Sequence, residues 1–391
     1  MRGTGTRGRT LPACRVSTES VAGEVRESFA SKTPLRISGS GGWLDAGRPV
    51  RAERTLSLRE QSGITSYVPA DLTITVRAGT LLSEIAAATR ERNQWLPLDP
   101  YGSPGGTIGA TIATGSAGPL SSSFGLARDL VLGLEFVNGR GEVVRGGGKV
   151  VKNVAGFDLS RLLTGSWGSL GVITEVTLRL YALPEVDRSF AINLNGSEKQ
   201  ITSLLRALST APISPFAFQL VSASISRALG LSEEPIGIMR FGGNSAAVKA
   251  QAAGLEQVAN THEIDASTWL RLRELEAGAH TSLRISSLPQ RIVATASRIL
   301  ADDVNGVYTS IDPRRGVIRV VAGSTGNAES PSELAAGVVQ GDSSELVFEK
   351  LPPELWAAVS PSVVGDSLSQ GIKRAYDPHN ILNPGILGDL N

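Results

Sequence analysis

The sequence has few of the residues that build disulfides and metal centres. Cys14 is the single cysteine, and the three histidines stand at positions 262, 280 and 379. One cysteine excludes an internal disulfide and any cysteine-built zinc or iron–sulfur site within the chain, and it fits a reducing compartment best. The three histidines do not have the spacing of metal ligands, so we expect no metal site.

The chain also has little net charge and no long apolar run. Its formal net charge is +1, and 19% of its 391 residues are charged while 41% are hydrophobic. This balance is typical of a globular protein large enough for two domains, and it gives no electrostatic case for a nucleic-acid partner. Because no stretch of about 18 apolar residues occurs, we expect no transmembrane segment. We expect a cytoplasmic protein, with membrane association only through partners.

The N-terminal segment 1–19 is rich in arginine. It carries four arginines and no acidic residue before Glu19. It superficially resembles an organelle transit segment, but it lacks the apolar core of a secretory signal. We expect a disordered tail or an over-extended start.

Glycine, in contrast, is concentrated in one part of the chain. Residues 102–171 hold 17 of the 44 glycines, where an even distribution would place about eight. Glycine weakens helices and strands, so this density requires either turns with positive φ or a group that lies against the backbone. These glycines stand at the ends of apolar segments. The pattern therefore predicts a large ligand embedded among strand ends.

Hydrophobic periodicity divides the chain into two α+β units. Before Pro184 it predicts helices over 20–30 and 81–92 and strands over 35–38, 72–78, 130–137, 142–145 and 172–180, with Asn138-Gly139 as a hairpin-type turn signal. From about residue 188 it predicts strands over 190–194 and 236–241, helices over 199–209 and 245–259, and an exposed loop over 326–337. The last forty residues combine a helix with the tail YDPHNILNPGILG.

Three familiar motifs fail their context tests. A G-x-G-x-x-G at Gly3, Gly5 and Gly8 has no strand before it and no helix after it. Lys149 follows three glycines, but Val150 stands where a phosphate loop needs Ser or Thr. The nucleophile motif G-x-S-x-G of many hydrolases does not occur.

Three other glycine-rich loops suit a ligand better. The loop SGSGGW (38–43) follows a strand and offers successive backbone amides to a pyrophosphate, although an ordinary glycine turn has the same composition. TIGATIATGSAG (107–118) would let a flat ring system approach the backbone, or it is a tightly packed helix–strand corner. In the third block, KVVKNVAGFDLSRLLTGSWGSLGVITE (149–175), Asp158 suits the N-cap of a helix and Lys152 is more often solvated than catalytic. Together the three loops favour one extended ligand.

Taken in order, these blocks resemble the FAD-binding domain of the vanillyl-alcohol oxidase superfamily. The resemblance rests on SGSGG, YVPADLTITVRAGTLLSEI, PLDPYGSPGGTIGATIATGSAG, the run from GLARDLVLGLEFVNGRGEVV to GSLGVITEV, and YDPHNILNPG. Within the superfamily, KNVAGFDLSRLLTGSWGSLGVITEV is most similar to the small FAD-binding subunits of bacterial glycolate oxidases.

The resemblance implies an α+β fold with a two-subdomain, PCMH-type FAD-binding domain. It divides the chain into a disordered tail (1–19), the FAD-binding domain (20–186), an α+β cap domain (187–352) and a C-terminal segment (353–391) that packs back on the FAD-binding domain. It implies that the pyrophosphate, the flavin with its ribityl chain, and the rest of the dinucleotide are bound by Ser38, Gly39, Ser40, Gly41, Gly42, Thr107, Ile108, Gly109, Thr114, Gly118, Gly168, Gly171, Val172, Ile173 and Asn383.

The sequence departs from the family's usual first loop, where Arg-Gly-Gly-Gly precedes Ser or Thr. We therefore expect the backbone rather than side chains to contact the pyrophosphate. Some relatives attach FAD through a His or Cys in these loops, and because none is present here, FAD is expected to be non-covalent.

The implied activity is the oxidation of a small 2-hydroxy acid, glycolate or D-lactate. Electrons would pass to partners, a larger flavoprotein subunit and an iron–sulfur subunit. No acid–base cluster is recognisable, and Arg128 and Lys152 are the cationic candidates nearest the flavin loops. Two alternatives stay open at this point: a catalytically silent FAD-binding scaffold, and a stand-alone flavin oxidase or dehydrogenase of another alcohol or sugar.

Overall fold

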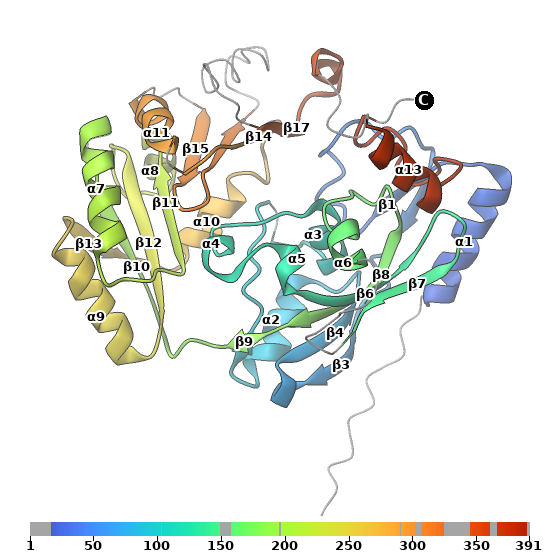
Figure 1. The fold of residues 1–391 in the computed structure, drawn as a ribbon, viewed down its shortest axis with the longest axis horizontal. Coiled ribbons are helices and arrows are strands. Elements are labelled where there is room, and N and C mark those ends of the chain that lie inside the picture. The colour runs from blue at the N-terminus through green and yellow to red at the C-terminus, as the bar shows by residue number, and fades with distance from the viewer. Residues whose placement is uncertain are drawn as a thin grey trace, which may run out of the picture.

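The computed structural model describes residues 17–102, 104–148, 158–194, 197–289, 291–301, 306–323, 345–359 and 366–388. Figure 1 shows two adjoining bodies: one from the N-terminal half of the chain, and one built on a second sheet with helices along its outer side. The red C-terminal helix lies beside the N-terminal body (Figure 1). Among the described helices, none combines the length and the hydropathy that a membrane span requires.

The N-terminal body is built on a five-stranded antiparallel sheet with strand order β3-β4-β8-β6-β7. Its strands are β3 (Ile64–Val68), β4 (Thr73–Arg77), β8 (Val172–Arg179), β6 (Val131–Val137) and β7 (Val143–Gly147). Two small sheets accompany it, the parallel pair β1 (Leu35–Ser38) and β2 (Arg54–Ser57) and the antiparallel pair β5 (Gln94–Trp95) and β9 (Tyr181–Ala182). The helical segments of this body are α1 (Thr18–Ser31), η1 (Pro69–Asp71), α2 (Leu82–Arg90), α3 (Ile108–Thr114), α4 (Ser121–Phe124), α5 (Ala127–Leu130) and α6 (Leu159–Leu163).

Local sequence explains where two of these helices begin. The Ser17 hydroxyl accepts the amide of Ser20, and α1 therefore starts at Thr18 inside the segment expected to be a disordered tail. That expectation is wrong for residues 17–19, and residues 1–16 lie outside the described part of the chain. Asp158 caps α6 by accepting the amide of Arg161, which confirms its expected role as a helix cap.

The β6–β7 hairpin forms as expected, but its glycines have other roles than the turn signal suggested. The strands pair as far as Val137 and Val143, so five residues connect them. The residue with left-handed backbone is Gly141, at φ +78°, and not Gly139. Gly139 is where the C-terminal tail approaches, because a Cβ there would lie 2.7 Å from the Cα of Asp377. The hairpin predicted at Asn138-Gly139 is confirmed, and the Gly141 amide donates to the Asn138 carbonyl at 2.9 Å across its turn.

The second body is an eight-stranded antiparallel sheet with strand order β13-β10-β12-β11-β15-β16-β14-β17. Its strands are β13 (Thr261–Ile264), β10 (Val186–Asn193), β12 (Ile236–Gly243), β11 (Ala217–Val221), β15 (Val307–Asp312), β16 (Val317–Ala322), β14 (Thr281–Ser286) and β17 (Glu345–Lys350). Its helices are α7 (Glu198–Thr210), α8 (Ala223–Ala228), α9 (Ser245–Glu256), α10 (Thr268–Glu274) and α11 (Ile292–Ala301). The strands and helices expected over 190–259 are all present; the loop expected over 326–337 lies outside the described residues.

The C-terminal segment, with η2 (Pro353–Ala358) and α13 (Ser367–Tyr376), returns to the N-terminal body. The amide of Leu35 donates to the carbonyl of Ile381 at 2.7 Å, and the amide of Asn383 donates to Leu35 at 2.9 Å. The tail thus runs as a short parallel strand beside β1, and Ile381 and Leu382 are fully buried in the N-terminal core. The expected domain boundaries stay a prediction. The strand β10 begins at Val186, one residue before the expected start of the cap domain at residue 187.

A carboxylate is buried in the loop between β5 and α3. Both oxygens of Asp99 lie 3.2 Å from the amide of Leu120, and a Cβ on Gly118 would collide with the Asp99 backbone. Burial raises the pKa of Asp99 to about 6, against the opposing effects of Arg273, the Leu120 amide and Arg240. The charged form is therefore disfavoured in the folded chain relative to the unfolded one.

This pKa predicts that Asp99 lowers stability as the pH rises. The folded pKa lies above the unfolded value, so the folded state loses stability between about pH 4 and pH 6, by about 2 to 3 kcal/mol in all. Asp99→Asn keeps an acceptor for Leu120 and removes the charge. Thermal unfolding should show Asp99→Asn more stable than wild type at pH 7.5 and equal to it near pH 4. The exposed Asp71→Asn is the control, and a lower Tm for Asp99→Asn at both pH values would contradict the account.

Candidate functional site

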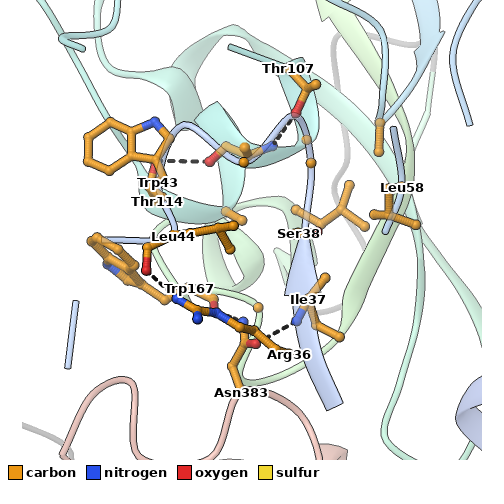
Figure 2. Close-up of a pocket in the computed structure, with 18 of the residues that line it drawn as sticks. Arg36, Ile37, Ser38, Trp43, Leu44, Leu58, Thr107, Thr114, Trp167 and Asn383 are labelled. Atoms are coloured by element: carbon orange, nitrogen blue, oxygen red, sulfur yellow. Dashed lines mark hydrogen bonds between the residues drawn. The ribbon is translucent and has the colours of Figure 1, made fainter. Parts of the chain in front are cut away.

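A first cavity, here called the cradle, lies where β1, α3, the turn at Trp167 and the C-terminal tail meet (Figure 2). Its volume is about 90 Å³. Most of the residues expected at a dinucleotide line it, namely Ser38, Gly39, Ser40, Gly41, Gly42, Thr107, Gly109, Thr114, Gly168, Gly171, Ile173 and Asn383. Of the other three, Ile108 and Val172 lie in the core with no exposed surface, and Gly118 lines a different cavity.

The loop Gly39–Gly42 presents backbone amides to the cradle. Within the described residues, none of its four amides donates a hydrogen bond. Gly39 has no room for a side chain, because a Cβ would lie 2.3 Å from the hydroxyl oxygen of Thr107. That hydroxyl accepts the amide of Ala110 and so caps α3. Gly41 has φ +94°, which favours glycine. Successive free amides of this kind form a concavity for an anion.

Asn383 fixes the other side of the cradle. Its Oδ1 accepts the amide of Ile37 at 2.7 Å, and its Nδ2 donates to the carbonyl of Trp167 at 2.7 Å (Figure 2). Asn383, Trp167 and Gly168 all have positive φ, at 44°, 55° and 70°. A Cβ on Gly168 would lie 2.8 Å from Asn383 Nδ2. The tail therefore holds β1 and the Trp167 turn at a fixed separation.

Large side chains that sequence reasoning did not single out also line the cradle. Trp43 and Trp167 meet edge to face with ring centroids 6.0 Å apart, and the Arg36 guanidinium donates to the carbonyl of Leu44. Trp43 ends the SGSGGW loop and Trp167 stands between two glycines of the third block, so their positions in those motifs are the signal that could have found them.

A second cavity of about 530 Å³, here called the interface cavity, lies between the two bodies. It shares Thr114 and Trp167 with the cradle. The N-terminal body contributes Gly115–Gly118, Leu126–Arg128 and Thr164–Gly165, and the large sheet contributes Gln219, Arg284, Ser310, Asp312, Val317, Arg319, Val347 and Glu349. Arg128, a sequence candidate, thus lies at this cavity, whereas Lys152 lies outside the described residues.

Buried ion pairs cover the sheet side of the interface cavity. Arg284 and Arg319 are directly opposite each other on β14 and β16, where two like charges repel. Glu349 bridges them, with its Oε1 3.3 Å from Arg284 Nε and its Oε2 on Arg319. Glu276 binds Arg319 through two hydrogen bonds of 2.6 and 2.7 Å. Burial lowers the pKa of Arg319, but Glu276 and Glu349 outweigh it and raise this pKa overall.

Tyr101 and Arg315 also line the interface cavity, and the pKa of each is shifted by its surroundings. The Arg319 guanidinium carbon lies 4.4 Å from the ring centroid of Tyr101, and burial raises the pKa of the Tyr101 hydroxyl above its usual range. Arg315 donates to the hydroxyl of Ser121 at 2.6 Å. Burial lowers the pKa of Arg315, Asp312 raises it, and the neighbouring charges of Arg284 and Arg128 lower it further. Arg315 therefore lies close enough to the guanidinium groups of Arg284 and Arg128 to be repelled by both.

Arg128 differs from the other arginines of the interface cavity. It is exposed, and it forms no hydrogen bond or ion pair with any described residue. A guanidinium without a partner, close to other cations at the wall of a cavity, is suited to bind an anion such as a carboxylate.

The histidines do not gather at either cavity. His262 lies on the edge strand β13, His280 precedes β14, and the His379 ring lies 4.5 Å from the Phe29 ring. Within the part of the chain that the structure describes, no group of three or more His, Cys, Asp or Glu residues is arranged to hold a metal ion.

Comparison with known proteins identifies the family. A model of the FAD binding domain matches residues 13–147. Glycolate oxidase subunit GlcE of Escherichia coli (strain K12) is 36% identical over 253 residues, which cover 64% of this chain and 67% of GlcE. The mitochondrial cytochrome-linked D-lactate dehydrogenase of Arabidopsis thaliana is 30% identical over 197 residues, covering 49% of this chain and only 34% of that protein.

A solved structure has the same fold. The 4-ethylphenol oxidase from Gulosibacter chungangensis aligns with a TM-score of 0.70 over 95% of this chain and 88% of its own, at 16% identity. The expected α+β, PCMH-type fold is therefore confirmed. The chain belongs to the PCMH-type FAD-binding oxidoreductase family that includes glycolate oxidase subunit GlcE.

Proposed function

We propose that the chain is the FAD-binding subunit of a glycolate-oxidase-like complex and oxidises a small 2-hydroxy acid at the interface cavity. The observation that carries this proposal is Arg128 at the wall of the interface cavity, which has no partner among the described residues and lies next to the glycine-lined cradle. An exposed guanidinium can bind the carboxylate that 2-hydroxy acids share. The relationship to GlcE supports glycolate as the first substrate to test.

The residues of the cradle fit FAD. Four amides without partners in the described structure offer hydrogen bonds to a pyrophosphate. Gly39 and Gly109 pack so closely against Thr107 and Ala78 that no side chain fits at either position, which fixes the loop and the start of α3 at the cradle. No His or Cys is among the described residues that line either cavity, which supports non-covalent binding. We assign the pyrophosphate to Gly39–Gly42 and the flavin end to the cavity wall near Thr114.

The chain's own residues would bind and orient the substrate. Bound FAD supplies a two-electron acceptor for the hydride equivalent removed from the carbinol carbon. Arg128 would hold the carboxylate, while Arg315 and Arg284 add positive potential in a cavity partly shielded from water. Arg319 is committed to Glu276 and Glu349 and would maintain the wall rather than bind substrate.

Partners are part of the proposal. With Cys14 as its one cysteine, the chain cannot build an iron–sulfur cluster alone. Electrons would therefore pass to an iron–sulfur subunit, beside a larger flavoprotein subunit, in the cytoplasm or at a membrane reached through partners. A silent FAD-binding scaffold is the second candidate, favoured by the lack of any histidine among the described lining residues.

Gly39→Ala tests the cradle. The new methyl group would press on Thr107 Oγ1, so either the loop or the cap of α3 must move. We expect the Kd for FAD, measured by titration of the apoprotein, to rise by about tenfold or more, a loss of about 1.4 kcal/mol. Gly23→Ala is the matched control, because a Cβ there meets no atom within 4 Å. Equal FAD affinity in the two variants would contradict the assignment.

Arg128→Ala tests the carboxylate site. Anaerobic mixing of the FAD-loaded chain, alone and with its partner subunits, with glycolate or D-lactate should bleach the flavin band. A charged hydrogen bond is worth about 1.5 to 3 kcal/mol, so half-saturation for the substrate should rise about 10- to 100-fold in Arg128→Ala.

The exposed Arg140→Ala, in the β6–β7 turn, is the control and should behave like wild type. Bleaching only when partners are present would favour the scaffold reading. Unchanged half-saturation in Arg128→Ala would exclude Arg128 as the carboxylate ligand.

A further inference from the structure

Asp312 lines the interface cavity and lies outside the ion pairs that Glu349 and Glu276 form there. Asp312 ends β15, and its Oδ1 accepts the amides of Arg314 at 3.0 Å and Arg315 at 3.1 Å. Its Oδ2 accepts no hydrogen bond from any described residue, and it is not among the buried atoms left without a partner. Because Asp312 lines the interface cavity and is only 5% exposed overall, this oxygen is the part of the side chain open to the cavity.

The other carboxylates nearby are already committed. Both oxygens of Glu349 are held by Arg284 and Arg319, and both oxygens of Glu276 are held by Arg319, with Ser282 as a further donor. Asp312 is therefore the one carboxylate lining this cavity, among the described residues, that keeps a free acceptor atom.

We propose that Asp312 Oδ2 accepts the hydroxyl proton of the 2-hydroxy acid whose carboxylate is held by Arg128. This inference rests on the proposed function. As the proton moves to Oδ2, the O–H electron pair becomes the second bond of the product carbonyl. Bound FAD would be the oxidant and would accept the C2 hydrogen with its electron pair. Water entering the cavity then removes the proton from Oδ2.

The surroundings of Asp312 suit a proton acceptor. Burial raises its pKa, while the Arg315 amide, the Arg315 charge, the Arg314 amide and the Arg314 charge oppose that rise. The other charged or titratable groups that line the cavity are Arg128 on α5, Arg284 on β14, Arg319 on β16, Glu349 on β17 and Tyr101. A carboxylate with a raised pKa holds a proton more strongly than an ordinary exposed aspartate does, which favours proton transfer to it.

A purely structural role makes a different prediction for the same substitution. Asp312 could serve only to close the β15–β16 turn through its two amide bonds, and an asparagine Oδ1 accepts the same two amides. Asp312→Asn therefore keeps the turn and removes the base. If the role is only structural, the variant is silent.

The experiment compares wild type, Asp312→Asn and the exposed Asp71→Asn as FAD-loaded chains in the presence of their partner subunits. We expect the limiting rate of flavin reduction by glycolate to fall about 100-fold or more in Asp312→Asn. Wild type and Asp71→Asn should lose rate as acid protonates the base, and Asp312→Asn should lack this acidic limb. Propionate, which has the carboxylate but no hydroxyl, should perturb the flavin spectrum at the same concentration in all three proteins. The Tm of Asp312→Asn should be no lower than that of wild type, because burial raises the pKa of Asp312 and the variant removes that buried charge.

Each outcome decides a different claim. If wild type is reduced and Asp312→Asn is reduced at the same rate with the same pH profile, the role of Asp312 is overturned and the proposed function stands. If wild type is reduced by no 2-hydroxy acid although it binds FAD, the proposed function fails and the proton acceptor fails with it. Loss of propionate binding in Asp312→Asn would show a disturbed cavity and would also overturn the proton-acceptor role.

Discussion

The two hydrogen bonds of the Asn383 side chain bring together the segments that form the cradle. They join the tail to Ile37 and Trp167, which lie 346 and 216 residues away in the sequence. An amide suits this position because it offers one acceptor and one donor on a single planar group. Aspartate would set a charge against the Trp167 carbonyl, and asparagine also tolerates the left-handed backbone at φ 44°. The glycine loop can hold a fixed shape only once the C-terminal tail has returned to β1.

The charged side chains of the interface cavity fall into two sets, those held in ion pairs and those that are not. Opposed arginines on neighbouring strands would destabilise the sheet, and Glu349 and Glu276 neutralise them through ion pairs. Among the described charged groups of this cavity, the guanidinium of Arg128 and one oxygen of Asp312 form no hydrogen bond. A free cation and a free acceptor in the same cavity are the minimum that binding a hydroxy acid and taking its proton requires. This division connects the fold to the proposed chemistry.

Much of the N-terminal body could be predicted from the sequence, because its information is local. Apolar alternation placed β4 and β8, the N-cap at Asp158 was readable, and the glycine loops indicated one extended ligand. The partner of Asn383 could not be found in this way, since nothing near residue 383 encodes contacts with Ile37 and Trp167. The close approach of Asp377 to Gly139 could not be predicted for the same reason, because it involves a segment distant in the sequence.

The interface cavity was harder to predict than the cradle. Its residues come from five strands of one sheet and from loops of the other body, and strand register alone sets Arg284 opposite Arg319. Asp312 followed by Pro313 looks like ordinary turn chemistry, and only its position at the cavity wall distinguishes it. Arg128 was found as a cation near the flavin loops, but its lack of a partner is a property of the folded chain.

The central claim is that backbone amides of one glycine loop, held in place by the C-terminal tail, bind the cofactor. An experimental structure of the chain with FAD tests it most directly. We expect pyrophosphate oxygens within hydrogen-bond distance of the Gly39–Gly42 amides, with the Asn383 bonds to Ile37 and Trp167 intact. A pyrophosphate bound instead at Arg128 and Arg315, with the glycine loop empty, would contradict it.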